Sequence, residues 1–193
     1  MNAVDWIAGI NPVDAVLALY LFAWFVLGYI SGSVRRGIGI LAITFSFLVA
    51  AQVQGPLGGF LAANWHQFPE TYSYMIGFGA VFIAAVVALS IVVSTSYHKS
   101  ILTPRFPVVD ELLGGILGAT QGYLLLIFVV VILDSHFLAS PGGLSGGVPF
   151  VHETWAMLDS TRIVTETRAQ VIPLLVYALS FLLPGSIKSL YLR

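Results

Sequence analysis

Four long apolar runs dominate the pattern of hydrophobic and polar positions along the chain. A helix that crosses a membrane needs about 20 residues, at 1.5 Å of rise per residue. The runs that meet or approach this length predict spans at about residues 13–32, 37–53, 72–95 and 112–133. The pattern therefore predicts an all-α integral membrane protein, with a four-helix transmembrane bundle in residues 1–135.

Polar residues mark the ends of two of these spans. The second span is the shortest, and we expect Gln52 and Gln54 at its interface with water. Asp110 precedes the fourth span, where its carboxylate is expected to act as the N-cap of the helix. The alternative for Asp110 is a role in ion binding, since acids near membrane helices are often functional.

The chain changes character after residue 135. Residues 136–152 are rich in glycine and proline, which predicts an extracytoplasmic linker, and residues 153–193 are predicted to form a helical tail. Asp159, Arg162 and Glu166 have the spacing of one helix face, which we interpret as a solvated face.

The apolar end of the tail allows two interpretations. Residues 171–183 are apolar, but Pro173 and Pro184 bracket them and the run is short for a span. We therefore expect an amphipathic or apolar helix that lies at the interface or re-enters the membrane. A fifth span over about residues 169–187 is the alternative, because no polar face is evident in this segment.

Composition supports a membrane protein and excludes several functions. The chain is 58% hydrophobic and 9% charged, whereas a soluble domain carries about 25% charged residues. A net charge of −1 leaves no basic surface for nucleic acid. The absence of cysteine excludes disulfides and thiolate chemistry. Since Arg35 is the first basic residue, we expect a retained first helix instead of a cleaved signal peptide.

The basic residues of the loops predict the orientation. Lys and Arg are retained on the cytoplasmic side of a membrane protein. Arg35 and Arg36 follow the first span, and Lys99 and Arg105 follow the third, whereas the other connecting segments of the bundle have no Lys or Arg. We therefore expect the N-terminus to be extracytoplasmic.

Small residues at every fourth position form a ridge along three of the spans. Because lipid is as apolar as the helices, their association depends on close backbone approach, which small residues allow. We expect the three ridges together to pack the helices into a compact bundle. For the ridge of the fourth span, we expect contact with a helix of the same chain, and contact with a second copy is the alternative. The ridges are Ala42, Ser46 and Ala50, then Ala80, Ala84 and Ala88, then Gly114, Gly118 and Gly122.

The sequence offers only weak candidates for a catalytic or metal site. Gly143–Gly147 matches the G-x-S-x-G of a nucleophile elbow, but glycines and prolines surround it where a strand and a helix are required. His152 and Glu153 begin an H-E-x-x-H motif that Ala156 breaks, and the histidines are isolated. We therefore predict no catalytic residue, no metal site and no cofactor.

A polar path through the third span is a further alternative. Ser90, Ser94 and His98 share one face of that span near its end. However, the middle of every predicted span is uncharged, whereas ion-coupled carriers place acids or bases there. We therefore do not expect this chain alone to couple transport to ions.

Two segments resemble the colicin V production protein (CvpA) family. The family has a turn that reads like R-G-F-x-R-E after the first span, and here the turn is Ser33–Ile38. The fourth span of the family opens like D-R-x-x-G-x-x-x-G-x-x-x-G and ends in Asp-Ser. This chain has Asp110, the glycine ridge and Asp134-Ser135 at those places, but Glu111 replaces the family's Arg, and Gly39-Ile40 its Arg-Glu. The resemblance covers about residues 13–173.

The resemblance implies a multi-pass protein of the bacterial plasma (inner) membrane. Its expected function is non-enzymatic and accessory to toxin production or export, or to envelope homeostasis. It is expected to act through other membrane proteins in the lipid bilayer. The alternatives are a small oligomeric channel or carrier, which would require a homo-oligomer, and a structural subunit of a larger membrane complex. An intramembrane enzyme is the remaining class.

Overall fold

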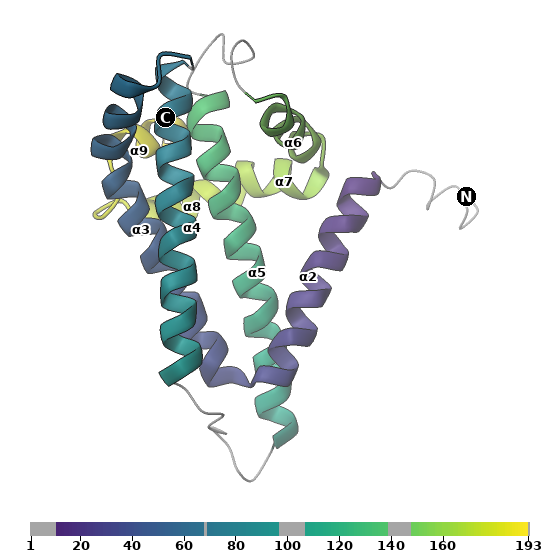
Figure 1. Ribbon diagram of the computed structural model, residues 1–193. Helices are drawn as coiled ribbons and strands as arrows, with labels where there is room; N and C mark the ends of the chain where they lie inside the picture. Colours follow the sequence, from purple (N-terminus) through teal and green to yellow (C-terminus); the bar gives the residue numbers. More distant parts are fainter. Residues whose placement is uncertain (1–10, 68, 97–106, 139–147, 193) are drawn as a thin grey trace, which may run out of the picture.

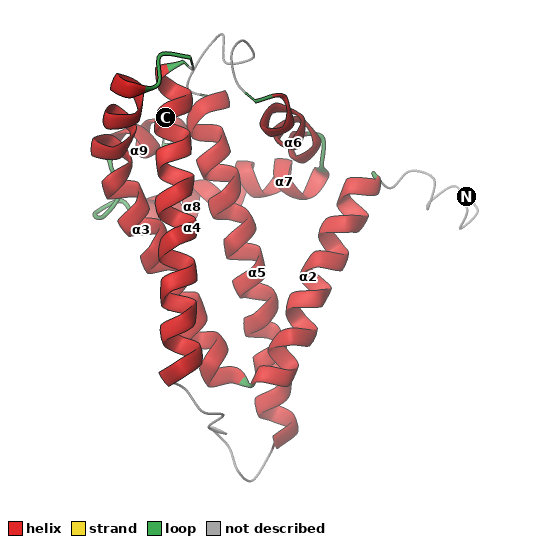
Figure 2. Ribbon diagram, in the orientation of Figure 1, coloured by secondary structure: helices red, strands yellow, loops and turns green. Residues whose placement is uncertain are grey.

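Helices make up almost all of the computed structural model, which describes residues 11–67, 69–96, 107–138 and 148–192. Figure 2 colours most of the described residues as helix, and the described residues contain no strand. Four of the helices are long and apolar enough to cross a membrane. They are α2 (Pro12–Ser31), α3 (Ser33–Asn64), α4 (Glu70–Ser96) and α5 (Pro107–Phe137). The chain is therefore an all-α membrane protein.

The turn between α2 and α3 depends on a single glycine. Gly32 has a φ of +82°, a conformation that residues with a Cβ rarely adopt. It ends α2 and begins α3 at once, so that no loop separates the two helices. This sharp turn lies at the end of the bundle opposite to the C-terminal helices (Figure 1).

α3 is longer than the sequence predicts. Gln52 and Gln54, expected at an interface, lie inside this helix, which continues through Pro56 to Asn64. Proline removes a helical hydrogen bond and usually breaks a helix. Here close packing on α4 holds the last turns, because a Cβ on Gly58 would lie 2.8 Å from Tyr74 Cα. Tertiary contact therefore overrides the local helix-breaking signal.

An aromatic cluster joins α3, α4 and α5. The rings of Phe47 and Phe128 are stacked, with 4.1 Å between their centroids. Phe78 and Phe82 of α4 lie against the ring of Phe47 at 5.5 and 6.3 Å. All four side chains are buried. Stacked and edge-on rings provide much dispersion energy, which helices in lipid need because burial from water contributes little to their association.

The glycine ridge of α5 packs against α2 of the same chain. A Cβ on Gly118 would lie 2.7 Å from Gly28 Cα, and a Cβ on Gly114 would lie 2.6 Å from the carbonyl oxygen of Gly28. Gly122 lies under the indole of Trp24 in the same way. These distances leave no room for a side chain, so the two backbones are in direct contact.

The other two ridges lie on different sides of the bundle. Ser46 and Ala50 are fully buried on the inner face of α3. By contrast, Ala80, Ala84 and Ala88 are exposed, because α4 turns its aromatic face inward. The expectation that this alanine ridge packs within the bundle is therefore wrong.

The tail folds back on the end of the bundle where α2 begins (Figure 1). Residues 162–178 form one continuous helix that runs across the long helices, and none of the described tail helices is long enough to span a membrane. Turn residues interrupt the chain before α9, so a continuous fifth span is not formed. The tail elements are α6 (Pro149–Asp159), α7 (Arg162–Glu166), the π-helical turn η1 (Thr167–Val171), α8 (Ile172–Ala178) and α9 (Gly185–Tyr191).

The predicted solvated face of the tail is only partly correct. Arg162 and Glu166 pair at 2.9 Å on the exposed surface of α7. Asp159, however, ends α6, and a break at Ser160 and Thr161 separates it from them. The three residues therefore do not share one helix face.

The backbone contact between α2 and α5 predicts that glycine-to-alanine substitutions will change stability differently at different positions. Gly118→Ala should lower the thermal stability of the purified protein in detergent, by about 1–3 kcal/mol, because the new methyl group must separate two backbones. Gly37→Ala is the matched control. It lies in α3 with open space around it, and alanine improves helix propensity there. Equal melting temperatures for the two variants would contradict the contact.

Candidate functional site

Asp134 is the centre of a polar site between α5 and the tail. Its side chain is fully buried and accepts four hydrogen bonds. Arg168 Nε and Nη2 donate to its two oxygens at 2.9 Å each. Trp155 Nε1 donates at 3.1 Å and the Tyr191 hydroxyl at 2.7 Å. The side chains come from α5, α6, η1 and α9, so this carboxylate connects three tail elements to the bundle.

Arg168 is shared between two carboxylates. Its Nη1 donates to Asp159 Oδ1 at 2.5 Å, and only 20% of its side chain is exposed. We call Asp134, Trp155, Asp159, Arg168 and Tyr191 the Asp134 cluster. A guanidinium that binds a carboxylate through two parallel hydrogen bonds forms one of the stronger polar contacts in proteins. The cluster combines two acids and one base, so its formal charge is −1.

The environment fixes the protonation of the tail residues in the cluster. Burial alone lowers the pKa of Arg168, but hydrogen bonds and charge from Asp134 and Asp159 outweigh it and raise the pKa above its usual value. Burial, and then the negative charge of Asp134, raise the pKa of Tyr191 far above its usual value. Arg168 therefore stays charged, and the Tyr191 hydroxyl stays a hydrogen-bond donor.

The cluster is suited to holding structure together. Each oxygen of Asp134 already accepts two hydrogen bonds, so this carboxylate has no free position for a substrate proton. A buried carboxylate with a complete set of donors orders the groups around it. We therefore interpret Asp134 as a structural residue that holds the tail against the bundle, and not as a general base.

Two further contacts attach the tail to the bundle. Both oxygens of Asp14, in the first turn of α2, accept backbone hydrogen bonds from Arg162 and Ile163 at 3.2 Å. Asp14 thereby satisfies amide groups at the start of α7. On the other side, the hydroxyls of Tyr123 and Thr167 lie 2.7 Å apart. The crossing helix is therefore fixed to both α2 and α5.

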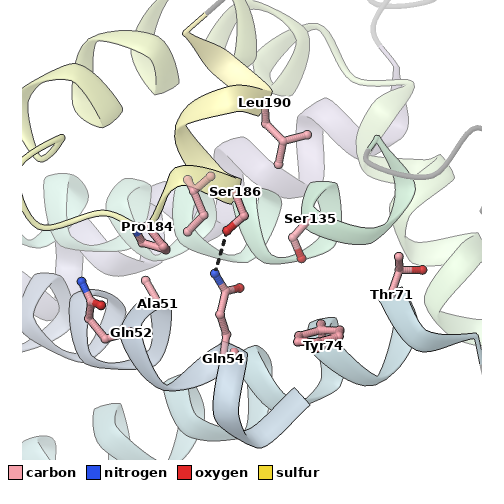
Figure 3. Close-up of a pocket in the computed structure, with 11 residues that line it drawn as sticks. Ala51, Gln52, Gln54, Thr71, Tyr74, Ser135, Pro184, Ser186 and Leu190 are labelled. Carbon is pink, nitrogen blue, oxygen red and sulfur yellow. Dashed lines mark hydrogen bonds between the residues drawn. The ribbon is translucent and has the colours of Figure 1, made fainter. Parts of the chain in front are cut away.

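A cavity of about 330 Å³ lies beside this junction (Figure 3). α3, α4, α5 and α9 contribute to it, and most of its lining is apolar. Gln54 Nε2 donates to Ser186 Oγ at 3.3 Å across it, and Gln52 Nε2 donates to the carbonyl of Leu182 at 2.6 Å. Ser135 donates to the carbonyl of Ile132 within α5. The two glutamines therefore connect α3 to the tail, and this is where their polar groups find partners.

Two of the four residues predicted to set the orientation, Arg35 and Arg36, lie in the first turn of α3, at the end of the bundle opposite to the tail. Arg35 is exposed there, and Arg36 donates to Ser31 Oγ at 3.0 Å and to Gln121 Oε1 at 3.1 Å. Lys99 and Arg105 lie outside the described residues.

Asp110 does not act as the predicted N-cap. α5 begins at Pro107, so Asp110 belongs to its first turn. Its buried carboxylate accepts a hydrogen bond from Ser33 Oγ, in the first residue of α3. An acid at a helix N-terminus is favoured by the helix dipole, and Asp110 lies in the first turn of α5 and against the first residue of α3. Asp110 therefore connects two spans, which the local sequence could not indicate.

The other sequence candidates give no catalytic or metal arrangement on the described residues. The G-x-S-x-G segment Gly143–Gly147 and His98 lie outside those residues. The His136 ring is buried, with its Nδ1 2.9 Å from the Thr71 hydroxyl. His152 lies edge-on against Phe137. Within the described residues, no three His, Cys, Asp or Glu side chains are grouped for a metal ion.

Sequence reasoning missed the Asp134 cluster. Asp134 was visible only as the end of a span, and Arg168 only as part of a polar run. One signal could have indicated the pair: Arg168 is followed by a long apolar segment, where a charged residue needs a partner.

Loss of either buried charge should release the tail. We expect Asp134→Asn and Arg168→Gln each to destabilise the protein by about 3 kcal/mol, because Asp134→Asn removes the buried charge that Arg168 binds through two hydrogen bonds, and Arg168→Gln leaves the buried Asp134 carboxylate without its positive partner. Limited proteolysis in detergent should then cut the tail first. Arg162→Gln is the control, since an exposed ion pair is screened by solvent and adds little to stability. Wild-type protease resistance in Asp134→Asn would show that the cluster does not hold the tail.

Comparison with known sequences agrees with this architecture. The family model described as colicin V production protein matches residues 13–157, about three quarters of the chain. No curated protein and no solved structure matches the chain. The matched region starts in α2 and ends in α6, so it contains all four long helices together with Asp134 and Trp155. The chain belongs to the colicin V production protein family.

Proposed function

We propose that this protein is a non-enzymatic, accessory protein of the bacterial plasma membrane. It acts in toxin production or export, or in envelope homeostasis, by binding other membrane proteins. Family membership and the four long apolar helices support this proposal. The positions of the charged residues, and the contacts that they make, support the proposal further.

The observation that carries the proposal is that the carboxylate of Asp134 has all of its hydrogen-bond acceptor positions filled. All four of its hydrogen bonds come from the chain itself, so the one fully buried carboxylate near the end of α5 holds the tail in place. Between Glu111 and Asp134, α5 contains no ionisable side chain other than Tyr123, and α4 has no Asp, Glu, Lys or Arg after Glu70. Ion-coupled carriers need such groups in mid-membrane. A binding function therefore fits this bundle better than a carrier function.

The outer face of α4 offers a surface for a partner helix. Ala80, Ala84 and Ala88 are exposed along it, with the exposed Ile83 and Val87 beside them. Small residues at fourfold spacing allow another helix to approach closely in lipid. Since the bundle does not use this ridge itself, a second protein is its proposed occupant.

The proposed orientation places the N-terminus and the tail outside the cytoplasm. Arg35 and Arg36 lie at one end of the bundle, and the tail lies at the other (Figure 1). Reporter fusions after Arg36 and Arg105 should therefore be cytoplasmic, and a fusion after Gln67 should be extracytoplasmic. An epitope tag after Arg193 should be accessible on intact spheroplasts. A cytoplasmic reporter at Gln67 would contradict the orientation.

Crosslinking in native membranes tests the proposed function. A photo-crosslinking amino acid at Ala84 should capture a different membrane protein, identified by mass spectrometry. The same group at Phe22, which is exposed on α2, should capture less, because no small-residue ridge surrounds it. Only homodimeric adducts, or equal capture at both positions, would contradict a dedicated partner surface. Ion flux through the purified protein in liposomes would favour the channel alternative.

A further inference from the structure

A second polar cavity lies at the end of the bundle opposite to the tail. It has a volume of about 240 Å³ and is formed between α2, α3, α4 and α5. Unlike the cavity beside α9, it is lined in large part by polar and charged side chains. The lining residues that matter here are Trp24, Ser31, Arg35, Arg36, Ser90 and Gln121.

The guanidinium of Arg36 is held in a fixed position at this cavity. Nη1 donates to Gln121 Oε1 at 3.1 Å, and Nη2 donates to Ser31 Oγ at 3.0 Å. Its Cζ lies 5.4 Å from the centre of the Trp24 ring, a cation–π distance. Its Nε is buried and has no acceptor among the described residues. A buried donor without an acceptor is rare in proteins and indicates a missing partner.

Among the residues that the structure describes, neither Arg35 nor Arg36 forms an ion pair. The three ion pairs of the described residues all involve Arg162 or Arg168, at the other end of the protein. The carboxylate of Asp110 instead accepts a hydrogen bond from Ser33. Two guanidinium groups without a carboxylate favour an anion.

We propose that this cavity binds a phosphate group, either the head-group phosphate of an anionic phospholipid or free phosphate. Phosphate oxygens accept hydrogen bonds from guanidinium groups in a well-matched geometry. Arg36 and Arg35 supply two positive charges at the cavity, and Ser90 supplies a hydroxyl. A basic cavity between membrane helices near their ends is a typical site for a lipid head group. The inference does not rest on the proposed partner binding.

Lipid titration of the purified full chain in a neutral detergent tests this site. Native mass spectrometry should show phosphatidylglycerol binding about ten times more tightly than phosphatidylcholine, since the choline cation would face Arg35. Competition by inorganic phosphate distinguishes a site for the lipid head group from a site for free phosphate. Efficient competition at millimolar concentration would assign free phosphate, and failure to compete would assign the lipid head group.

Charge-neutralising variants complete the test. Arg36→Gln should weaken phosphatidylglycerol binding about tenfold or more, and Arg35→Gln should weaken it about threefold to tenfold. Arg35 is exposed, so its variant should fold even if Arg36→Gln does not. Arg162→Gln removes the same charge at the opposite end and should bind like wild type. The proposal is overturned if Arg35→Gln and Arg162→Gln bind equally, or if the two lipids bind equally to the wild type.

Discussion

Close packing against α5 is the constraint on which the rest of the structure depends. Helices in lipid gain little from burying apolar surface, so they must gain from direct contact. α5 provides two different contacts on two of its sides. Its glycines meet the backbone of Gly28 in α2, and Phe128 stacks on Phe47 of α3 at 4.1 Å. α4 packs mainly on α3, and its Phe78 and Phe82 join it to the same aromatic cluster.

Each end of α5 also carries a buried carboxylate that reaches another helix. Asp110 accepts a hydrogen bond from Ser33 at the start of α3, next to the tight turn at Gly32. Asp134 binds Arg168 and thereby orients the crossing helix of the tail. Both carboxylates would be costly if they were left without donors away from water. The same charges therefore help to specify where the turn and the tail can lie.

The two ends of the bundle consequently differ in what they can bind. At the tail end, the charges of the Asp134 cluster are satisfied by one another, which favours a fixed architecture. At the opposite end, the positive charges of Arg35 and Arg36 form no ion pair with any described residue, which favours an anionic ligand from outside the chain. The family match ends at residue 157, so Asp159, Arg168 and Tyr191 lie beyond it. The Asp134 cluster, which holds the tail to the bundle, therefore contains residues inside and outside the range that the family model matches.

The sequence by itself determined that the chain is a membrane protein with four long helices. The predicted first span, residues 13–32, differs little from Pro12–Ser31, because hydropathy and length are local properties. The glycine pattern and the basic turn also sufficed to indicate the family. Only the tertiary structure decided which face of each helix turns inward. In a soluble protein polar residues mark the outer face, but in lipid both faces are apolar, so the pattern could not show that Ala84 is exposed while Ser46 is buried. The pairing of Asp134 with Arg168 joins residues far apart in the chain, and it exists only because the tail folds back on α5.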